Sequence, residues 1–152
     1  MTTKNMSGPG VMSYQHTQSG TLIVAAMLAA AILVVVPIGC FLDPHAFLIA
    51  PILLVTCWAF SSLTVEITDT ELRWHFGPGL IHKRIRLADI ASAKPVRTNF
   101  LEGWGIHYSR FGWLYNVSGC DAVAITLHTG KRFALGTDEP QALLRQLPDS
   151  RA

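Results

Sequence analysis

The side chains that could do chemistry are few in this sequence, and their spacing does not join them into a site. Four of the six histidines lie in the C-terminal part, at His75, His82, His107 and His128. Zinc sites use clustered His, Cys or carboxylate ligands, and no Cys/His spacing here matches one. His75, His82 and His128 have the outward parity of their expected strands, so we interpret them as solvated. The sequence predicts no catalytic residue, metal or cofactor, and indicates that the protein is not an enzyme.

The three cysteines do not change this prediction. Cys40 and Cys57 lie in strongly apolar sequence, where they behave as small apolar side chains. Cys120 belongs to the C-terminal part, and a nucleophile pair with His107 would require the two side chains to meet in space. Nothing in the sequence supports such a pair.

A short basic run is the first candidate binding feature. It contains Lys83, Arg84 and Arg86, and a second basic pair, Lys131–Arg132, lies elsewhere. Close to a membrane, such residues contact anionic lipid headgroups with about 1 kcal/mol each. An ordinary solvated face that keeps an edge strand from aggregating explains the same run. Both interpretations stay open.

Clustered aromatic residues are the second candidate feature. The segment 99–119 is rich in glycine and aromatic side chains, among them Trp104, Tyr108, Phe111 and Trp113. Aromatic residues gathered on a loop are typical of a binding surface, either for a partner or for the membrane. They also close a core beneath a long loop, and the sequence does not separate these two roles.

These candidates must be positioned by the elements around them, and the dominant element is apolar. Residues 21–63 are almost wholly apolar and are interrupted once, at Asp43-Pro44-His45. A membrane span needs about 20 apolar residues, which predicts a transmembrane helical hairpin with spans over 21–42 and 46–63. Residues 1–20 are polar and carry one charge, so we expect a flexible tail.

The basic residues predict the orientation of this hairpin. The turn at 43–45 contains no Lys or Arg, whereas Lys4 precedes the first span and Arg73 follows the second. Positive residues stay on the cytoplasmic side. We therefore expect a multi-pass membrane protein with both termini in the cytoplasm.

Beyond residue 63 the apolar period changes to two, in short runs separated by turns, which predicts an antiparallel sheet. About seven strands are followed by an amphipathic helix with Leu143, Leu144 and Leu147 on one face. Asp138 is the expected cap of this helix. The pattern predicts a small barrel or pair of sheets over residues 64–152, plugged at one open end by the helix.

Four short motifs add a resemblance to this layout. They are Leu87-Ala88-Asp89-Ile90, Gly103-Trp104-Gly105-Ile106, Asn116-Val117-Ser118-Gly119 and Gly136-Thr137-Asp138-Glu139-Pro140. With the hairpin, the chain resembles small bacterial membrane proteins that carry a pleckstrin-homology-like domain. The resemblance implies an α+β fold: a transmembrane hairpin, then an antiparallel barrel or sandwich capped by a C-terminal helix. It also implies a bacterial inner (plasma) membrane location, and it carries over no active site.

Together these observations predict a membrane-anchored interaction module that binds a protein partner or organises an assembly, including a homo-oligomer. The alternative is a domain that binds anionic lipid through a Lys83, Arg84 and Arg86 face, and an enzyme is third. The net charge of +2 is too small to indicate the basic face of a nucleic-acid-binding protein.

Overall fold

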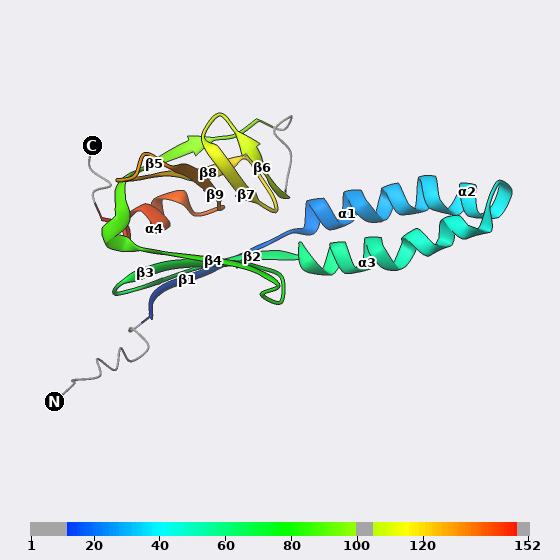
Figure 1. Cartoon of the computed structure of the whole chain (residues 1–152), viewed down its shortest axis with the longest axis horizontal. Helices are drawn as coiled ribbons and strands as arrows, with labels where there is room; N and C mark the ends of the chain where they lie inside the picture. Colours follow the sequence, from blue (N-terminus) through cyan, green and yellow to red (C-terminus); the bar gives the residue numbers. More distant parts are fainter. Residues whose placement is uncertain (1–11, 100–104, 149–152) are drawn as a thin grey trace.

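The computed structural model describes residues 12–99 and 105–148 of the chain. They form an α+β structure in which two β-sheets face each other and a pair of helices projects from one end (Figure 1). The predicted α+β class is therefore confirmed. Within these residues the two sheets do not join into a closed barrel, so the predicted pair of sheets describes the structure and the barrel does not.

The first sheet has four antiparallel strands in sequence order, and the second has five strands in the order β5-β8-β9-β7-β6. In the second sheet only the β7–β9 pair is parallel. The strands of the first sheet are β1 (Met12–Ser19), β2 (Ser62–Thr68), β3 (Glu71–Phe76) and β4 (Ile81–Arg86). Those of the second are β5 (Ile90–Arg97), β6 (Gly105–Ser109), β7 (Gly112–Asn116), β8 (Asp121–Leu127) and β9 (Arg132–Gly136).

The N-terminal strand corrects the domain boundaries expected from the sequence. Residues 12–19 were expected within a flexible tail, but they form β1 and pair with β2 along its length. The sheet domain therefore begins before the apolar stretch, and the helices are an insertion between two neighbouring strands. The flexible-tail prediction is wrong for residues 12–19, and residues 1–11 lie outside the described chain.

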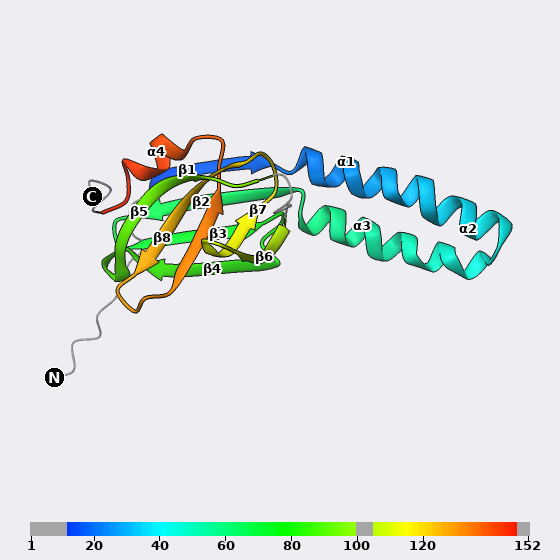
Figure 2. The same ribbon diagram turned by 90° about the horizontal axis from the view of Figure 1, so that it is seen from above.

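The inserted helices form what we call the helical arm, residues 21–59. The outgoing helix is continuous through α1 (Thr21–Ala30), the π-helical turn η1 (Ala31–Val35) and α2 (Val36–Phe41). The returning helix comprises the 3-10 segment η2 (Pro44–Leu48) and α3 (Ile49–Ala59), and it lies beside α1 (Figure 2). The second apolar helix thus ends at Ala59, because residue 62 already belongs to β2, rather than at residue 63.

Pro37 explains the irregular turn in the outgoing helix. A proline inside a helix has no N–H to donate, and its ring clashes with the carbonyl four residues earlier. The π-helical turn ends two residues before Pro37, and such turns relieve this kind of crowding. Two residues after Pro37, Gly39 faces the return segment so closely that an added Cβ would lie 2.6 Å from the Phe47 ring.

The arm joins the first sheet without a linker. The Gly20 N–H donates to the Ser61 carbonyl at 2.7 Å, which closes the base of the arm. Gly77, in the turn between β3 and β4, has a positive φ of 46° and lies against the end of α3. A Cβ at that position would lie 2.6 Å from the Trp58 carbonyl oxygen. Backbone contacts of this kind fix the direction of the arm relative to the sheet.

The core fills the space between the two sheets. Its buried apolar side chains come from both sheets and from the C-terminal segment, which supplies Leu143, Leu144 and Leu147. The predicted apolar face of the C-terminal helix is therefore buried as expected. The helix itself, α4 (Pro140–Leu144), is shorter than expected, and Asp138 does not cap it, because the residue before the helix is Glu139 and no side chain bonds to its N-terminus.

Candidate functional site

The three basic residues predicted to share a lipid-binding face do not share one. Arg84 lies on the outer face of the first sheet, opposite Arg73 in register. Arg86 has the same parity, but its guanidinium donates two hydrogen bonds to the Asp89 carboxylate, at 3.1 and 2.9 Å. These bonds raise the pKa of Arg86. Lys83 has the opposite parity and faces the inside of the sandwich.

Lys83 reaches the rim of the core instead of the solvated outer face. It lies opposite Trp74, which is buried, in the β3–β4 register. The Lys83 Nζ atom is 5.4 Å from the centroid of the Tyr115 ring, a cation–π distance. Ile81 and Ile85, its neighbours of the same parity, are half-buried against the core. Lys83 therefore places a positive charge at the open side of the sandwich.

The predicted aromatic surface is also divided. Tyr108 and Trp113 are partners in the β6–β7 hairpin, 75% and 50% exposed, and their rings meet edge to face at 6.0 Å. Phe111 packs instead against the small cluster on the outer face of the second sheet, beneath Arg110. Trp104 lies outside the described residues. The core-closing interpretation holds for Phe111, whereas Tyr108 and Trp113 remain exposed and available to a partner.

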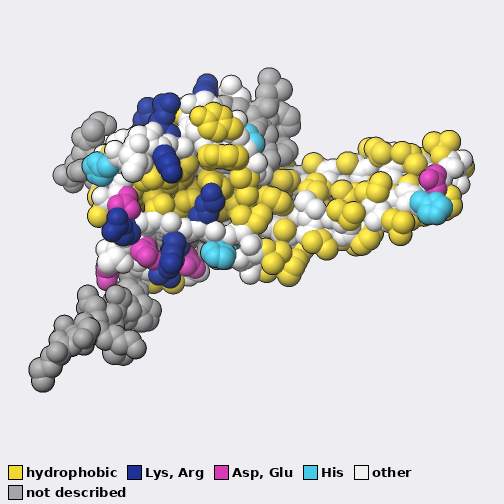
Figure 3. Space-filling view, in the orientation of Figure 1, with side chains coloured by type: hydrophobic (Ala, Val, Ile, Leu, Met, Phe, Trp, Pro, Cys, Tyr) yellow, Lys and Arg dark blue, Asp and Glu magenta, His cyan; other side chains and the backbone are white. Residues whose placement is uncertain are grey.

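Lys83, Tyr108 and Trp113 meet in one groove. Trp113 shares its parity with Tyr115, which is buried in the core, so both face the first sheet, where Lys83 faces them. The groove has a volume of about 500 Å³, and Lys131 and Arg132 from the β8–β9 connection complete it. Figure 3 shows Lys and Arg side chains beside a hydrophobic surface on this side of the domain. We call this site the basic-aromatic groove; it is lined by Lys83, Tyr108, Gly112, Trp113, Gly130, Lys131 and Arg132.

The charge of the groove is uncompensated. No carboxylate of the described chain lines it. None of Lys83, Lys131 and Arg132 forms an ion pair within the described residues, whereas Arg73 and Arg86 do. Exposed cations beside aromatic faces suit a ligand with negative charge and some apolar surface.

Gly112 allows the parts of the groove to approach each other. Its φ of 92° is left-handed, and a Cβ there would lie 2.0 Å from the Arg132 carbonyl oxygen. Gly130, at the turn before β9, has a φ of 81° but open space where a Cβ would stand. Only glycine lets the start of β7 lie directly against the start of β9. This contact brings the aromatic hairpin next to Lys131 and Arg132.

A second hollow, on the outer face of the first sheet, has a different character. It encloses about 430 Å³ among side chains that include Glu66, Arg73, His75 and Arg84. Its charges are mixed, since Arg73 pairs with Glu71 at 2.7 Å and His75 lies 4.0 Å from Glu66. No group of three or more potential metal ligands occurs anywhere in the described chain. This hollow therefore holds no such ligand group among the described residues. Its lining carries Arg73, Lys83 and Arg84 beside the carboxylate of Glu66, whereas the basic-aromatic groove has cations alone.

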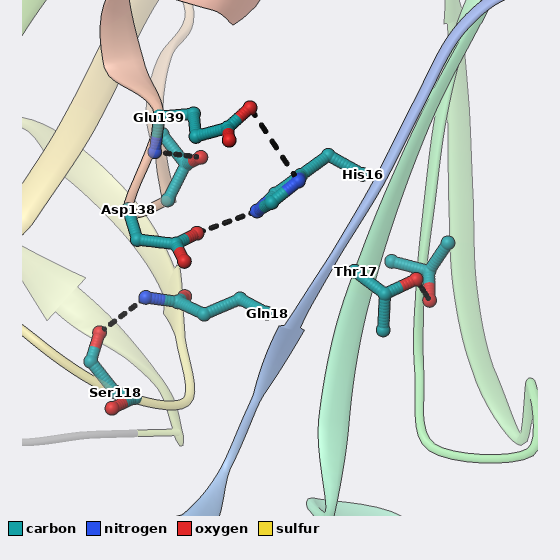
Figure 4. A network of polar contacts seen from close by, with 8 residues as sticks. His16, Thr17, Gln18, Ser118, Asp138 and Glu139 are labelled. Atoms are coloured by element: carbon teal, nitrogen blue, oxygen red, sulfur yellow. Dashed lines mark hydrogen bonds and ion pairs between the residues drawn. The ribbon is translucent and has the colours of Figure 1, made fainter.

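The opposite side of the sandwich is closed by polar contacts from β1 (Figure 4). His16 Nε2 lies 2.5 Å from the Asp138 carboxylate, and His16 Nδ1 lies 3.7 Å from Glu139. Gln18 donates to the Ser118 carbonyl at 2.9 Å. Asp138 is thus drawn to β1, which explains why it does not cap α4. These contacts join the N-terminal strand to the C-terminal segment.

Comparison with protein-family models, with curated proteins and with solved structures finds no match for the chain.

Proposed function

We propose that the protein is a membrane-anchored interaction module: the helical arm lies in a bilayer, and the basic-aromatic groove of a pleckstrin-homology-like domain binds a protein partner. The groove is the observation that supports binding of a protein partner. It combines two exposed aromatic rings with three cations that have no carboxylate partner among the described residues. Exposed aromatic and basic side chains in a concave site are the usual anchors of protein recognition.

The surface of the arm supports the membrane location. Sixteen of the twenty exposed large hydrophobic side chains of the described chain lie on it, far more than a water-exposed surface tolerates. Hydrophobic side chains cover the arm in Figure 3. The outgoing helix, Thr21–Phe41, is long and apolar enough to cross a membrane, while the apolar return helix, Pro44–Ala59, is shorter. The 21 residues of the first span about 31 Å, close to the roughly 30 Å of a bilayer core.

The polar groups of the arm support the same location. The Thr56 hydroxyl donates to the Ile52 carbonyl within its own helix at 2.8 Å, as polar groups in lipid must. The polar pair at the tip, Asp43 with His45 at 2.7 Å, lies at the end far from the sheets. With no Lys or Arg in the arm, the basic residues of the domain favour the cytoplasm for both termini, in a bacterial inner membrane.

The position of the groove favours a protein over the host bilayer. The β8–β9 connection, which supplies Lys131, lies at the end of the domain away from the arm (Figure 2). With the arm in the membrane, that part of the groove faces away from the lipid surface. Electrostatic attraction to anionic lipid falls off within about 10 Å of the surface. A soluble or peripheral partner reaches the groove from this side without obstruction.

The two-sheet arrangement and buried C-terminal helix support the pleckstrin-homology-like assignment, since they are what the resemblance implies.

The orientation of the chain in the membrane is tested with reporter fusions at Ala152 and within the turn at 43–45. A reporter that works only outside the cytoplasm should be active in the turn and silent at Ala152. Activity at Ala152 would refute the cytoplasmic domain.

Partner binding is tested by affinity purification of the full chain from gently solubilised membranes. Trp113→Ala and Lys83→Glu should remove a co-purifying protein, because they change the aromatic and cationic walls of the groove. Trp58→Ala, a change of an equally exposed tryptophan on the arm, is the matched control and should retain it. Identical profiles for all three variants, with loss of binding to phosphatidylglycerol vesicles in Lys83→Glu alone, would favour a lipid-binding domain instead.

A further inference from the structure

The outer edge of β4 is open along the groove. The sheet order places β4 at one end of the first sheet, and no described strand pairs with its outer edge. The Leu87 N–H donates to the Thr70 carbonyl at 2.9 Å, just beyond the β3–β4 ladder. Hydrogen-bonded and non-bonded pairs alternate in an antiparallel ladder. The backbone groups of His82, Arg84 and Arg86 therefore point to the open edge, while those of Lys83 bond to β3.

The same strand forms one wall of the groove. Its residues of inward parity are Ile81, Lys83 and Ile85, and Lys83 lines the groove directly. Tyr108 and Trp113 line it from the other sheet. An extended chain lying along β4 would bond to the edge with its backbone. Every second side chain of that chain would then enter the groove between Lys83 and the two rings.

Other edges of the molecule do not offer this combination. The edge strand β5 contains Pro95, which has no N–H to donate to an added strand. β1 lies on the far side of the domain from the groove, where His16 and Gln18 contact Asp138 and Ser118. β4 contains no proline. Two edge strands flank the groove: β6 contributes the ring of Tyr108, and β4 contributes a cation, Lys83.

We propose that the partner binds as an added β-strand on β4 and that its groove-facing side chains are acidic. The inference rests on the proposed function, and it specifies the partner chemistry: an extended segment with Glu or Asp at every second position. Backbone bonds to His82, Arg84 and Arg86 supply affinity, and the alternate acidic side chains supply specificity. The lysine and arginine residues of β4 also discourage edge-to-edge aggregation, and the experiment separates this role from recognition.

The probe is a labelled peptide of alternating Glu and Val, about eight residues long, a usual strand length. It is titrated against the full chain in phosphatidylcholine nanodiscs. With Glu facing Lys83 in an added strand antiparallel to β4, the Val N–H groups face β4, because side-chain direction and N–H direction alternate together along a strand. N-methylation of the valines should therefore weaken binding about tenfold, by loss of two or more hydrogen bonds. N-methylation of the glutamates is the matched control and should change it less than about twofold.

Protein variants test the same contact from the other side. Arg84→Pro removes an edge N–H and should weaken binding, while Arg84→Gln keeps the backbone and should retain most of it. Lys83→Glu should weaken binding about tenfold or more, whereas Lys94→Glu, an exposed lysine outside the groove, should not. If Arg84→Pro does not fold, the peptide pair still decides the question.

Equal binding of the two methylated peptides, or no binding of the parent peptide, would overturn the added strand. So would displacement of the peptide by phosphatidylglycerol in the nanodisc. Each of these results leaves the proposed function intact if Trp113→Ala still removes the co-purifying protein. The proposed function fails separately, when that protein is retained by every groove variant.

Discussion

The two long sides of the sandwich are built differently. On one side, β1 and the C-terminal segment close the space between the sheets, with His16 against Asp138 and Gln18 against Ser118. On the other side, β4 faces the β6–β7 hairpin across a groove of about 500 Å³. There Tyr108 and Trp113 are exposed, and no carboxylate of the described chain lies between the cations.

We expect the closed side to contribute to the stability of the fold and the open side to contribute to recognition. On the closed side, His16 pairs with Asp138 and the Gln18 amide donates to Ser118. On the open side, the cations have no carboxylate partner within the described chain and two aromatic rings stay exposed, a combination that suits an external partner. Substitutions on the closed side should therefore change the free energy of unfolding, whereas side-chain substitutions on the open side should change binding.

The largest effect is expected from Leu144→Asp, which breaks the closed side. Leu144 is 6% exposed and belongs to the core cluster, so the variant buries a carboxylate without a partner. The expected cost is about 5 kcal/mol, comparable with the stability of a small domain. Loss of protease resistance in the solubilised full chain measures it. Arg145→Asp, at the exposed neighbour, is the control, and equal resistance of both variants would show that α4 does not seal the core.

The next largest effect is expected from crowding of the backbone on the open side. This substitution should change the free energy of unfolding, unlike the side-chain substitutions on that side. Gly112→Ala forces a Cβ against the Arg132 carbonyl at a left-handed φ, with an expected cost of about 3 kcal/mol. Gly130→Ala has a similar φ but open space, and should cost only about 1 kcal/mol. The difference in thermal unfolding between the two variants measures the contact that assembles the groove. Equal midpoints would mean that β7 and β9 do not press together there.

The strands were predicted correctly from the sequence where apolar residues alternate, and β1, where they do not alternate, was missed. The period-two patterning beyond residue 63 predicted antiparallel strands, and the structure contains them, except that β7 and β9 pair in parallel. β1 was missed because its inward residues are Tyr14, His16 and Gln18. His16 contacts Asp138, which lies 122 residues later in the sequence, and Gln18 contacts Ser118, which lies 100 residues later. Local sequence patterns do not encode contacts between residues so far apart in the chain.

The groove was predictable only in part. Lys83, Tyr108 and Trp113 were identified as candidates, but in two separate sites. The sequence does show that Lys83 alternates in step with Ile81 and Ile85. This alternation places Lys83 and Arg84 on opposite faces of the strand. What the sequence does not show is the parallel pairing of β7 with β9, which brings Lys131 and Arg132 to the aromatic hairpin. That pairing depends on tertiary packing and on the crowded Gly112.

A smaller effect is expected from the polar contact of the closed side. Asp138→Asn weakens the interaction with His16, whose side chain is 22% exposed. Ion pairs that remain partly exposed contribute about 1 kcal/mol or less, so the unfolding midpoint should fall slightly. Asp121→Asn, whose partner Arg97 lies 4.0 Å away and is largely exposed, is the control and should have no measurable effect. If the two variants behave alike, the contact does not hold β1 in place.

The smallest effect at neutral pH, and the most specific, concerns Tyr14 on the closed side. Burial first, and then the nearby carboxylates of Glu139 and Asp138, raise the pKa of the Tyr14 phenol to about 12. Its hydroxyl has no hydrogen-bond partner in the described chain. Tyr14→Phe should therefore cost nothing measurable at pH 7. A group whose folded pKa lies above its ordinary value of 10 stabilises the folded state below that pH.

That stabilisation disappears as the pH rises from about 10 to about 12, because the unfolded phenol ionises first. The wild-type chain should lose more thermal stability than Tyr14→Phe over this interval. Glu139→Gln, which removes one of the two nearby charges, should fall between them. Parallel pH profiles for wild type and Tyr14→Phe would show that the phenol is solvated, and hence that β1 does not close its side of the sandwich.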